Sequence, residues 1–276
     1  MLASSFLSVD PISLARPDKD SMPQQTLMEI LVGDFDDKQC FRDEKGDFYA
    51  ACSWDGVKCT SDDEVYYIDW DLDPGLDLLG RDGPVHQGGL IDLHWIPSNV
   101  TKFSIPLLDL SGSIDTCSLP EKLVSLVIND NIFKGKFNIA ELPRKLRKAN
   151  VARNWLCGSL DLSRLPQSLE VFHASDNEFS GTIDLRSLPV SLQKFSLEGN
   201  HLSGFLDLRY LPRTIIYCHF GENDFQQDVV VFSSERTNIR YLALDNHKFG
   251  SFIDTNGEAV RMVRSSDKKT LKLAWH

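Results

Sequence analysis

The chain has 276 residues, a formal net charge of −11 at pH 7 and 42% hydrophobic residues. A globular chain of this length can bury a large core. Its acidic balance argues against nucleic acid or an anionic membrane as the main partner. No apolar run approaches the ~18 residues that indicate a membrane-spanning helix, so no membrane span is expected.

Residues 1–22 show no ordering pattern and are expected to form a loose tail. A signal peptide needs a basic segment followed by an unbroken apolar core, but Ser8 and Asp10 interrupt a short apolar run that no Lys or Arg precedes. This favours an intracellular location. A helix is predicted at about residues 24–32, with Pro23 near its first turn.

Residues 65–70, VYYIDW, are predicted to form a first strand. A protruding loop is predicted at residues 71–88, because DLDPGLDLLGRDGPVHQG does not fit the repeat of the rest of the chain. Long loops in compact domains are often functional, and a tolerated insertion is the alternative.

From there the chain repeats one unit, LPxSLxxFxxxxNxxSGxxDLRxLP, which is clearest over residues 165–212. Proline recurs every 23 residues at Pro97, Pro120, Pro143, Pro166, Pro189 and Pro212, and so does an asparagine. Such a period indicates a repeat architecture. Five and three residues before each asparagine, apolar residues alternate with others, as in Phe172/Ala174 and Phe195/Leu197, which predicts a short strand with one buried face.

The asparagine side chains are expected to bond backbone groups of their own and neighbouring turns, because an amide offers two donors and an acceptor. Stacked coils would then form a buried ladder at a spacing of ~4.8 Å. Exposed turn residues are the alternative, but they do not explain one residue type at every repeat. The expected ladder residues are Asn131, Asn154, Asn177, Asn200, Asn223 and Asn246.

This unit resembles the leucine-rich-repeat signature LxxLxLxxNxLSGxI, in the variant of kinetoplastid, surface-antigen-like proteins, where DL replaces the usual IP. The resemblance implies an α/β fold: a right-handed solenoid with a parallel β-sheet on its concave face and little helix outside the N-terminal cap. It places the solenoid at residues 65–255. Residues 256–276 are expected to form a C-terminal cap, with a frayed basic tail after Ser265.

Residues 52–59, CSWDGVKC, resemble the plant-type N-terminal cap CxWxGVxC, so residues 23–64 are expected to cap the solenoid. The resemblance implies a possible disulfide between Cys52 and Cys59. Two reduced thiols are the alternative, and a zinc site lacks two further ligands at matching spacing. The other four cysteines form no disulfide framework, so the compartment stays open and a secreted or surface location is the alternative to an intracellular one.

The concave face is the expected binding surface, because a rigid surface that varies from coil to coil is how solenoids recognise partners. One edge of it reads mainly basic and the other mainly acidic. A contact centre is predicted between His173 and Arg240. The candidate binding residues are Lys148, Asn150, Arg153, His173, Lys194, Glu198, Tyr217, His219, Glu222 and Arg240.

Catalysis and metal binding are not expected. His173 and His219 share a column but lie two repeats apart, which is ~10 Å at strand spacing and too far for one ion without a third ligand. No serine, histidine and acid are placed for nucleophilic catalysis. A second column (Asp92, Asp115, Asn138, Asp161, Asp184, Asp207) offers few oxygen ligands per calcium ion, so capping of backbone groups or a solvated row is favoured over a calcium ladder.

The chain is therefore predicted to be a non-catalytic protein-interaction module that binds a protein partner on its concave face. It is expected to be a monomer and to need no cofactor. The alternative is a secreted or cell-surface recognition or inhibitor protein that binds an extracellular target.

Overall fold

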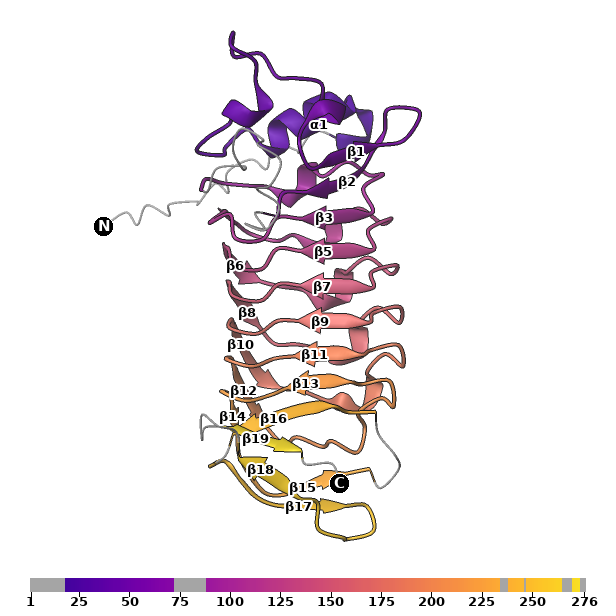
Figure 1. Cartoon of the computed structure of the whole chain (residues 1–276), viewed down its shortest axis with the longest axis vertical. Helices are drawn as coiled ribbons and strands as arrows, with labels where there is room; N and C mark the ends of the chain where they lie inside the picture. Colours follow the sequence, from indigo (N-terminus) through magenta and orange to yellow (C-terminus); the bar gives the residue numbers. More distant parts are fainter. Residues whose placement is uncertain (1–17, 72–87, 234–237, 246, 265–269, 274–276) are drawn as a thin grey trace, which may run out of the picture.

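The computed structural model describes residues 18–71, 88–233, 238–245, 247–264 and 270–273. The chain winds into a β-solenoid whose coils have a spacing of about 23 residues. Figure 1 shows the coils stacked in chain order, with α1 at one end and β15 and β17 at the other. The expected fold class is confirmed. The predicted tail (1–17 of it) and nearly all of the predicted 71–88 loop lie outside the described residues.

One long sheet of 11 strands runs along the solenoid. Neighbouring strands from β2 to β16 are parallel, and each contributes one coil. Because most of these strands are three residues long, each puts one side chain into the core and two on the outer surface. In sheet order from the N-terminal end, the strands are β1 (Val57–Cys59), β2 (Val65–Asp69), β3 (Lys102–Ser104), β5 (Ser125–Val127), β7 (Lys148–Asn150), β9 (Val171–His173), β11 (Lys194–Ser196), β13 (Tyr217–His219), β16 (Tyr241–Asp245), β19 (Thr270–Leu273) and β18 (Met262–Arg264).

A second, six-stranded sheet follows the repeat asparagine of each coil, or Leu108 in the coil of β3. Its strands are β4 (Ser111–Gly112), β6 (Ile132–Lys136), β8 (Trp155–Gly158), β10 (Glu178–Thr182), β12 (His201–Gly204) and β14 (Asp224–Phe225). Single 3-10 turns then lead back toward the long sheet: η5 (Leu93–Trp95), η6 (Thr116–Ser118), η7 (Ile139–Glu141), η8 (Leu162–Arg164) and η9 (Leu185–Ser187). Proline follows each turn and starts the return, as the repeat predicts.

The strand register follows the 23-residue period up to β13 and then changes. Lys194 pairs with Tyr217, but Tyr217 pairs with Tyr241, which is 24 residues further on. A 23-residue step from Tyr217 predicts Arg240, one of the predicted binding residues, as its neighbour in the sheet, and this prediction is wrong because Tyr241 takes that position. Leu242 and Leu244 are fully buried in the last coil, where the sequence pattern had placed Tyr241 and Ala243.

The core between the sheets is one continuous apolar cluster of leucine, isoleucine and phenylalanine. Phe172 and Phe195 stack with ring centroids 6.1 Å apart, and Phe195 meets Phe220 edge-on at 5.5 Å. Fully burying such a side chain contributes about 1.5–3 kcal/mol. The same repeat positions therefore supply the core side chains of every coil.

Five buried asparagines form the expected ladder: Asn131, Asn154, Asn177, Asn200 and Asn223, with 1–7% of each residue exposed. Each amide nitrogen donates to one carbonyl of the preceding coil and to carbonyls of its own turn. Each amide oxygen accepts a backbone N–H of the preceding coil at 3.0 Å. Asn246, the sixth predicted member, lies outside the described residues.

The N-terminal cap forms as the sequence indicates. α1 spans Gln24–Leu31, and two 3-10 turns, η2 (Gln39–Phe41) and η3 (Ala51–Ser53), follow it. Phe41 contacts Trp54 and Trp70 with ring centroids 4.6 and 5.4 Å apart, which covers the first coil. Gly56 is required because an added Cβ would lie 2.1 Å from the Asp69 carbonyl oxygen. Cys52 and Cys59 form a disulfide.

At the other end, β15 (Gln227–Phe232) and β17 (Phe249–Asp254) form a two-stranded parallel sheet below the six-stranded one. β19 and β18 add to the long sheet in antiparallel fashion. The expected frayed tail after Ser265 is wrong for residues 270–273, because β19 pairs with both β16 and β18. These strands cover the last coil, as an N-terminal cap covers the first.

Candidate functional site

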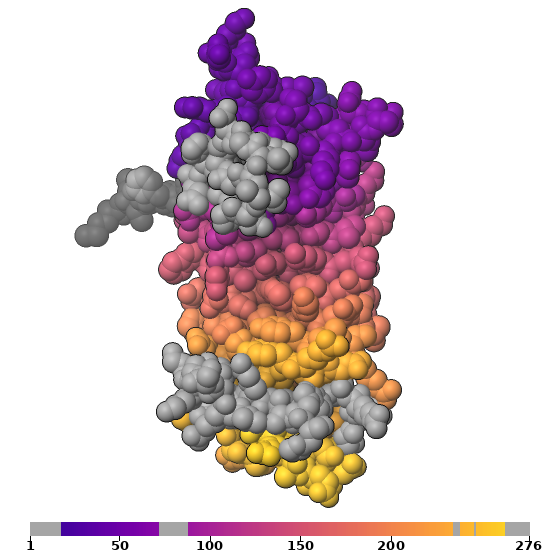
Figure 2. Space-filling view, viewed as in Figure 1, coloured from indigo at the N-terminus to yellow at the C-terminus, as the bar shows by residue number. Residues whose placement is uncertain are grey.

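The outer surface of the long sheet, which we call the sheet face, is built from two columns of side chains. The first column comprises Lys102, Ser125, Lys148, Val171, Lys194, Tyr217 and Tyr241, and the second Ser104, Val127, Asn150, His173, Ser196, His219 and Ala243. Figure 2 shows the coils crossing this side of the molecule as successive bands, so each coil supplies its own side chains to the surface.

A polar pocket of about 250 Å³ opens on the sheet face between β7 and β13. It brings together five of the ten predicted binding residues: Asn150, Arg153, His173, Glu198 and Tyr217. Asn129, Asp130, Ala152, Ser175, Asp176 and Ser196 complete its lining. The sequence thus identified part of this pocket, although it did not distinguish lining residues from neighbours.

Two hydrogen-bonded pairs hold the lining polar groups. Asn150 Nδ2 donates to Asn129 Oδ1 at 2.8 Å. Ser175 Oγ and Ser196 Oγ lie 2.7 Å apart and are buried. The first contact links the coils of β5 and β7 and the second those of β9 and β11, so these lining groups are held in place rather than left to solvent.

Aromatic rings meet at the C-terminal side of the pocket. Tyr217 stacks on Tyr241 with ring centroids 4.6 Å apart and an angle of 6°. His173 lies on the other side of Tyr217, at 6.3 Å. Burial, with the neighbouring Tyr241, raises the pKa of Tyr217 to about 12, so its hydroxyl remains a neutral donor at physiological pH. Tyr241 is the residue that the sequence reasoning missed, because the extra residue before it moved the column by one position.

The two histidines differ in their surroundings. His219 is only 5% exposed, and its Nδ1 lies 2.6 Å from Glu198 Oε2. Burial, followed by the charges of Lys194 and Lys148, lowers the pKa of His173, which favours its neutral form. Among the described residues, the buried Nε2 atoms of both rings have no hydrogen-bond partner. His219 is therefore part of the wall of the sheet face and not a free surface group.

An ion-pair row follows the edge of the pocket, where the strands end. Arg153 Nη1 lies 3.2 Å from Asp130 Oδ1, and its Nε lies 3.5 Å from Asp176 Oδ2. Arg153 is two-thirds exposed, so this row is a solvated one that contributes little to stability. Both partners raise the already high pKa of the Arg153 guanidinium, with the hydrogen bond that it donates to Asp130 as the largest effect.

The remaining predicted residues lie around the pocket and do not line it. Lys148, Lys194, Glu222 and Arg240 are exposed. The Glu222 backbone N–H donates to Asp245 Oδ1 at 2.8 Å, which links the last two coils. Arg240 precedes β16 and lies outside both columns.

The predicted aspartate column caps the 3-10 turns. Asp92, Asn138, Asp161 and Asp184 each accept the backbone N–H two residues on, and Asp207 does the same for Arg209. Asp115 makes no such cap bond. Capping therefore explains the column, and no group of three or more metal-ligating side chains occurs among the described residues.

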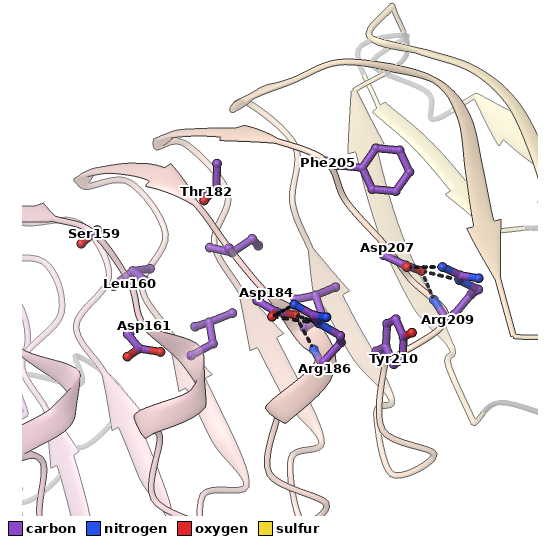
Figure 3. Close-up of a pocket in the computed structure, with 13 residues that line it drawn as sticks. Ser159, Leu160, Asp161, Thr182, Asp184, Arg186, Phe205, Asp207, Arg209 and Tyr210 are labelled. Atoms are coloured by element: carbon purple, nitrogen blue, oxygen red, sulfur yellow. Dashed lines mark hydrogen bonds and ion pairs between the residues drawn. The ribbon is translucent and has the colours of Figure 1, made fainter.

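A wider groove, of about 760 Å³, runs beside this column, and the sequence reasoning did not find it. Figure 3 shows Arg186 and Arg209 each paired with the aspartate of its own coil, with Phe205 and Tyr210 beside them. The closest distances are 2.6 Å for both Arg186–Asp184 and Arg209–Asp207. Phe205 is 61% exposed and Tyr210 44%. The groove is thus a second surface with exposed aromatic and arginine side chains.

No described helix is long and apolar enough to cross a membrane. No protein-family model and no curated protein sequence matches the chain.

Solved structures do show similarity. The alignment with a plant ice-binding protein covers 84% of this chain and 71% of that protein, at 19% identity and a TM-score of 0.60. Pollen Receptor Kinase 3 matches 82% of this chain with 95% of its own length, at 16% identity and a TM-score of 0.51. The LRR ectodomain of the receptor kinase SOBIR1 from Arabidopsis thaliana covers 73% of this chain and 94% of itself, at 15% identity and a TM-score of 0.45. Together with the coil spacing and the long parallel sheet, the likenesses to the first two structures show the fold alone, a leucine-rich-repeat β-solenoid.

Proposed function

We propose that this protein is a non-catalytic, monomeric module that binds a protein partner on the sheet face, centred on the pocket between β7 and β13. The observation that carries the proposal is the pocket itself: a preorganised polar hollow, flanked by the Tyr217–Tyr241 stack, on a long surface whose side chains change from coil to coil.

The composition of this surface fits a protein interface. Tyrosine and arginine most often carry binding energy at interfaces, and they do so in central positions that exclude water. Tyr217, Tyr241 and Arg153 surround the pocket. Exposed Lys148 and Lys194 lie along the first column, with Asp176 and Glu222 exposed at the opposite edge. A partner with the reverse charge arrangement would gain in orientation and association rate.

The sheet face also extends over several coils. Adjacent strands lie ~4.8 Å apart, so the six strands from β5 to β16 extend over ~24 Å along the solenoid. The pocket lies within this span, which supports a contact centre on the C-terminal half.

The type of repeat and the cellular location are also part of this proposal. We infer that the repeat is of the kinetoplastid, surface-antigen-like type, on the consensus LPxSLxxFxxxxNxxSGxxDLRxLP. A secreted or surface recognition protein is the alternative setting, and the Cys52–Cys59 disulfide supports it, because such bonds persist in oxidising compartments. Ice binding, which the name of one structural neighbour states, is not proposed for this chain, because similarity to a structure at 19% identity shows the fold alone.

Site-specific photo-crosslinking tests which surface binds. A photo-reactive residue would replace Lys194 on the sheet face or Thr182 in the groove of Figure 3, in the full chain and in extracts of its own cells. Crosslinks to the same protein from position 194 and not from position 182 are expected. Crosslinks from position 182 alone would move the site to the groove.

A matched set of substitutions tests the affinity for the crosslinked protein. Lys194→Ala with Tyr217→Ala is expected to weaken binding at least tenfold with little change in melting temperature, since both side chains reach the surface. Phe205→Ala with Tyr210→Ala is the control on the groove. His219 is left intact, because it is buried and its removal would disturb the fold. If only the groove pair weakens binding, the assignment to the sheet face is wrong.

A further inference from the structure

Asn99, Val100 and Thr101 form the one Asn-X-Ser/Thr tripeptide in the sequence. An asparagine in this tripeptide, with any residue except proline in the middle, is the acceptor for N-linked glycosylation when it lies on a surface segment of a secreted protein. The tripeptide alone is a weak signal, so its structural setting decides whether it can serve as a site.

Asn99 lies in a turn between η5 and β3. The Val100 N–H donates to the Pro97 carbonyl at 3.0 Å, which closes the turn, and Val100 itself is fully buried. Ser98 is exposed and Asn99 is half-buried. The apolar middle residue thus anchors the turn in the core, while the asparagine stays at the surface.

The same turn position in later coils is tied to the preceding coil. Ser168, Ser191 and Thr214 each donate their hydroxyl to two backbone carbonyls, at 2.7–2.9 Å. Asn99 instead accepts a hydrogen bond from Lys122 Nζ through Oδ1. Within the described residues its Nδ2 donates to no group, so the atom that a glycan would modify is not used by the fold.

The cap supplies the second line of evidence. The Cys52–Cys59 disulfide lies in the cap next to this coil. Disulfides form and persist in secretory and extracellular compartments and are rare in the cytosol. N-linked glycosylation belongs to the secretory route, so the disulfide and the tripeptide indicate the same compartment.

We propose that Asn99 is a site of N-linked glycosylation, with a lipid-diphosphate-linked oligosaccharide as the donor. The Asn99 Nδ2 attacks the anomeric carbon of the donor sugar. The new N–C bond forms as the C–O bond to the diphosphate breaks. The lipid diphosphate leaves with the electron pair, and the amide nitrogen gives up one proton.

The position of the glycan would leave the pocket free. The coil of β3 is separated from that of β13 by five strand spacings, or ~24 Å. A glycan at Asn99 would therefore lie over the side of the first coils and not over the Tyr217–Tyr241 stack. The glycan and the proposed partner would occupy different parts of the solenoid.

The chain contains a matched control. Asn238 occupies the corresponding turn of the last coil, where it is exposed and its Nδ2 donates to the Arg213 carbonyl at 3.0 Å. Ile239 and Arg240 follow it, so it lacks the required hydroxyl residue. Arg240→Thr would create the tripeptide at this second turn.

The test uses the full chain, produced behind a cleavable secretion leader in a eukaryotic host and weighed before and after enzymatic removal of N-linked glycans. One modified site is expected in the wild type and in Thr101→Ser, and none in Asn99→Gln or Thr101→Ala. An unmodified wild type overturns the proposal, and a modified Arg240→Thr chain would then show that the failure is specific to Asn99. Peptide mapping of the protein from its own cells is the second measurement, and an unmodified Asn99 there overturns the proposal for the natural protein.

Discussion

The asparagine ladder makes the sharpest prediction for stability, and Asn177 at its centre is the residue to change. Its Nδ2 donates to the Val151 and Ser175 carbonyls, both at 3.0 Å. Its Oδ1 accepts the Leu156 N–H at 3.0 Å. Asn177→Leu removes these bonds and leaves the Leu156 N–H without its acceptor and away from water, because residue 177 is 5% exposed. The two carbonyls each keep another donor, Asn154 Nδ2 for Val151 and the Arg153 N–H for Ser175.

The unsatisfied buried N–H costs about 1–3 kcal/mol, and each lost bond to a carbonyl that keeps another donor costs about 0.5–1.5 kcal/mol, so the total is ~2 kcal/mol at the low end. A chain of this size loses about 2–4 °C in melting temperature for each kcal/mol. We therefore expect Asn177→Leu to melt at least ~4 °C below the wild type in a calorimetric scan. Backbone hydrogen exchange should also quicken at Leu156, whose N–H loses its acceptor.

Glu178→Leu is the matched control, because it places the same side chain one residue away on the surface. Glu178 Oε2 lies 2.9 Å from His201 Nε2, and both side chains are about half exposed. An exposed pair of this kind contributes about 0–1 kcal/mol. If Asn177→Leu lowers the melting temperature no more than Glu178→Leu, the ladder does not stabilise the solenoid as described.

Three further predictions concern other parts of the chain. Side-chain and backbone hydrogen bonds from Arg186 lower the pKa of Asp184 from 3.8 to about 2, so the pair stabilises the fold above about pH 3.8 and this contribution is lost as the pH falls to about 2. Arg186→Ala should return the pKa of Asp184 toward 3.8 in an NMR titration. A pKa still near 2 would contradict this cause. Leu107 is 47% exposed and has a φ of 59°, a conformation that costs a non-glycine residue ~1 kcal/mol, so Leu107→Gly should raise the melting temperature by ~2–4 °C, and a decrease would refute the strain. Deletion of residues 1–64 should uncover the first coil and cause aggregation in light scattering, whereas a soluble, cooperatively folding product would show that the cap is dispensable.

Much of the fold follows from the sequence because each repeat position has one local physical role. The apolar positions predicted the buried face of every strand up to β13, and the strand pairs confirm the 23-residue step. Asn177 and its counterparts were predicted as a buried ladder because no exposed turn explains one residue type in every unit. The helix at α1 and the first strand at β2 also lie where their local patterns indicated.

Such reasoning could not predict which side chains of the last coil face the core. Residues 240–245 read RYLALD, and their alternation fits two frames, with either Tyr241 and Ala243 or Leu242 and Leu244 inside. The core selects the second frame, because it buries both leucines completely and leaves Tyr241 to stack on Tyr217. A pattern within one strand cannot make that choice, since it depends on the neighbouring coil.

The candidate site shows the same division. The sequence by itself predicted which side chains of each strand up to β13 point away from the core, because side-chain direction alternates along a strand whatever its neighbours are. Only the tertiary structure decided that His219 is buried against Glu198, that Asn150 pairs with Asn129, and that the aspartate column caps its own turns. These contacts join residues about one coil apart or depend on a turn geometry that the repeat consensus does not specify, so they exist only once the coils have stacked.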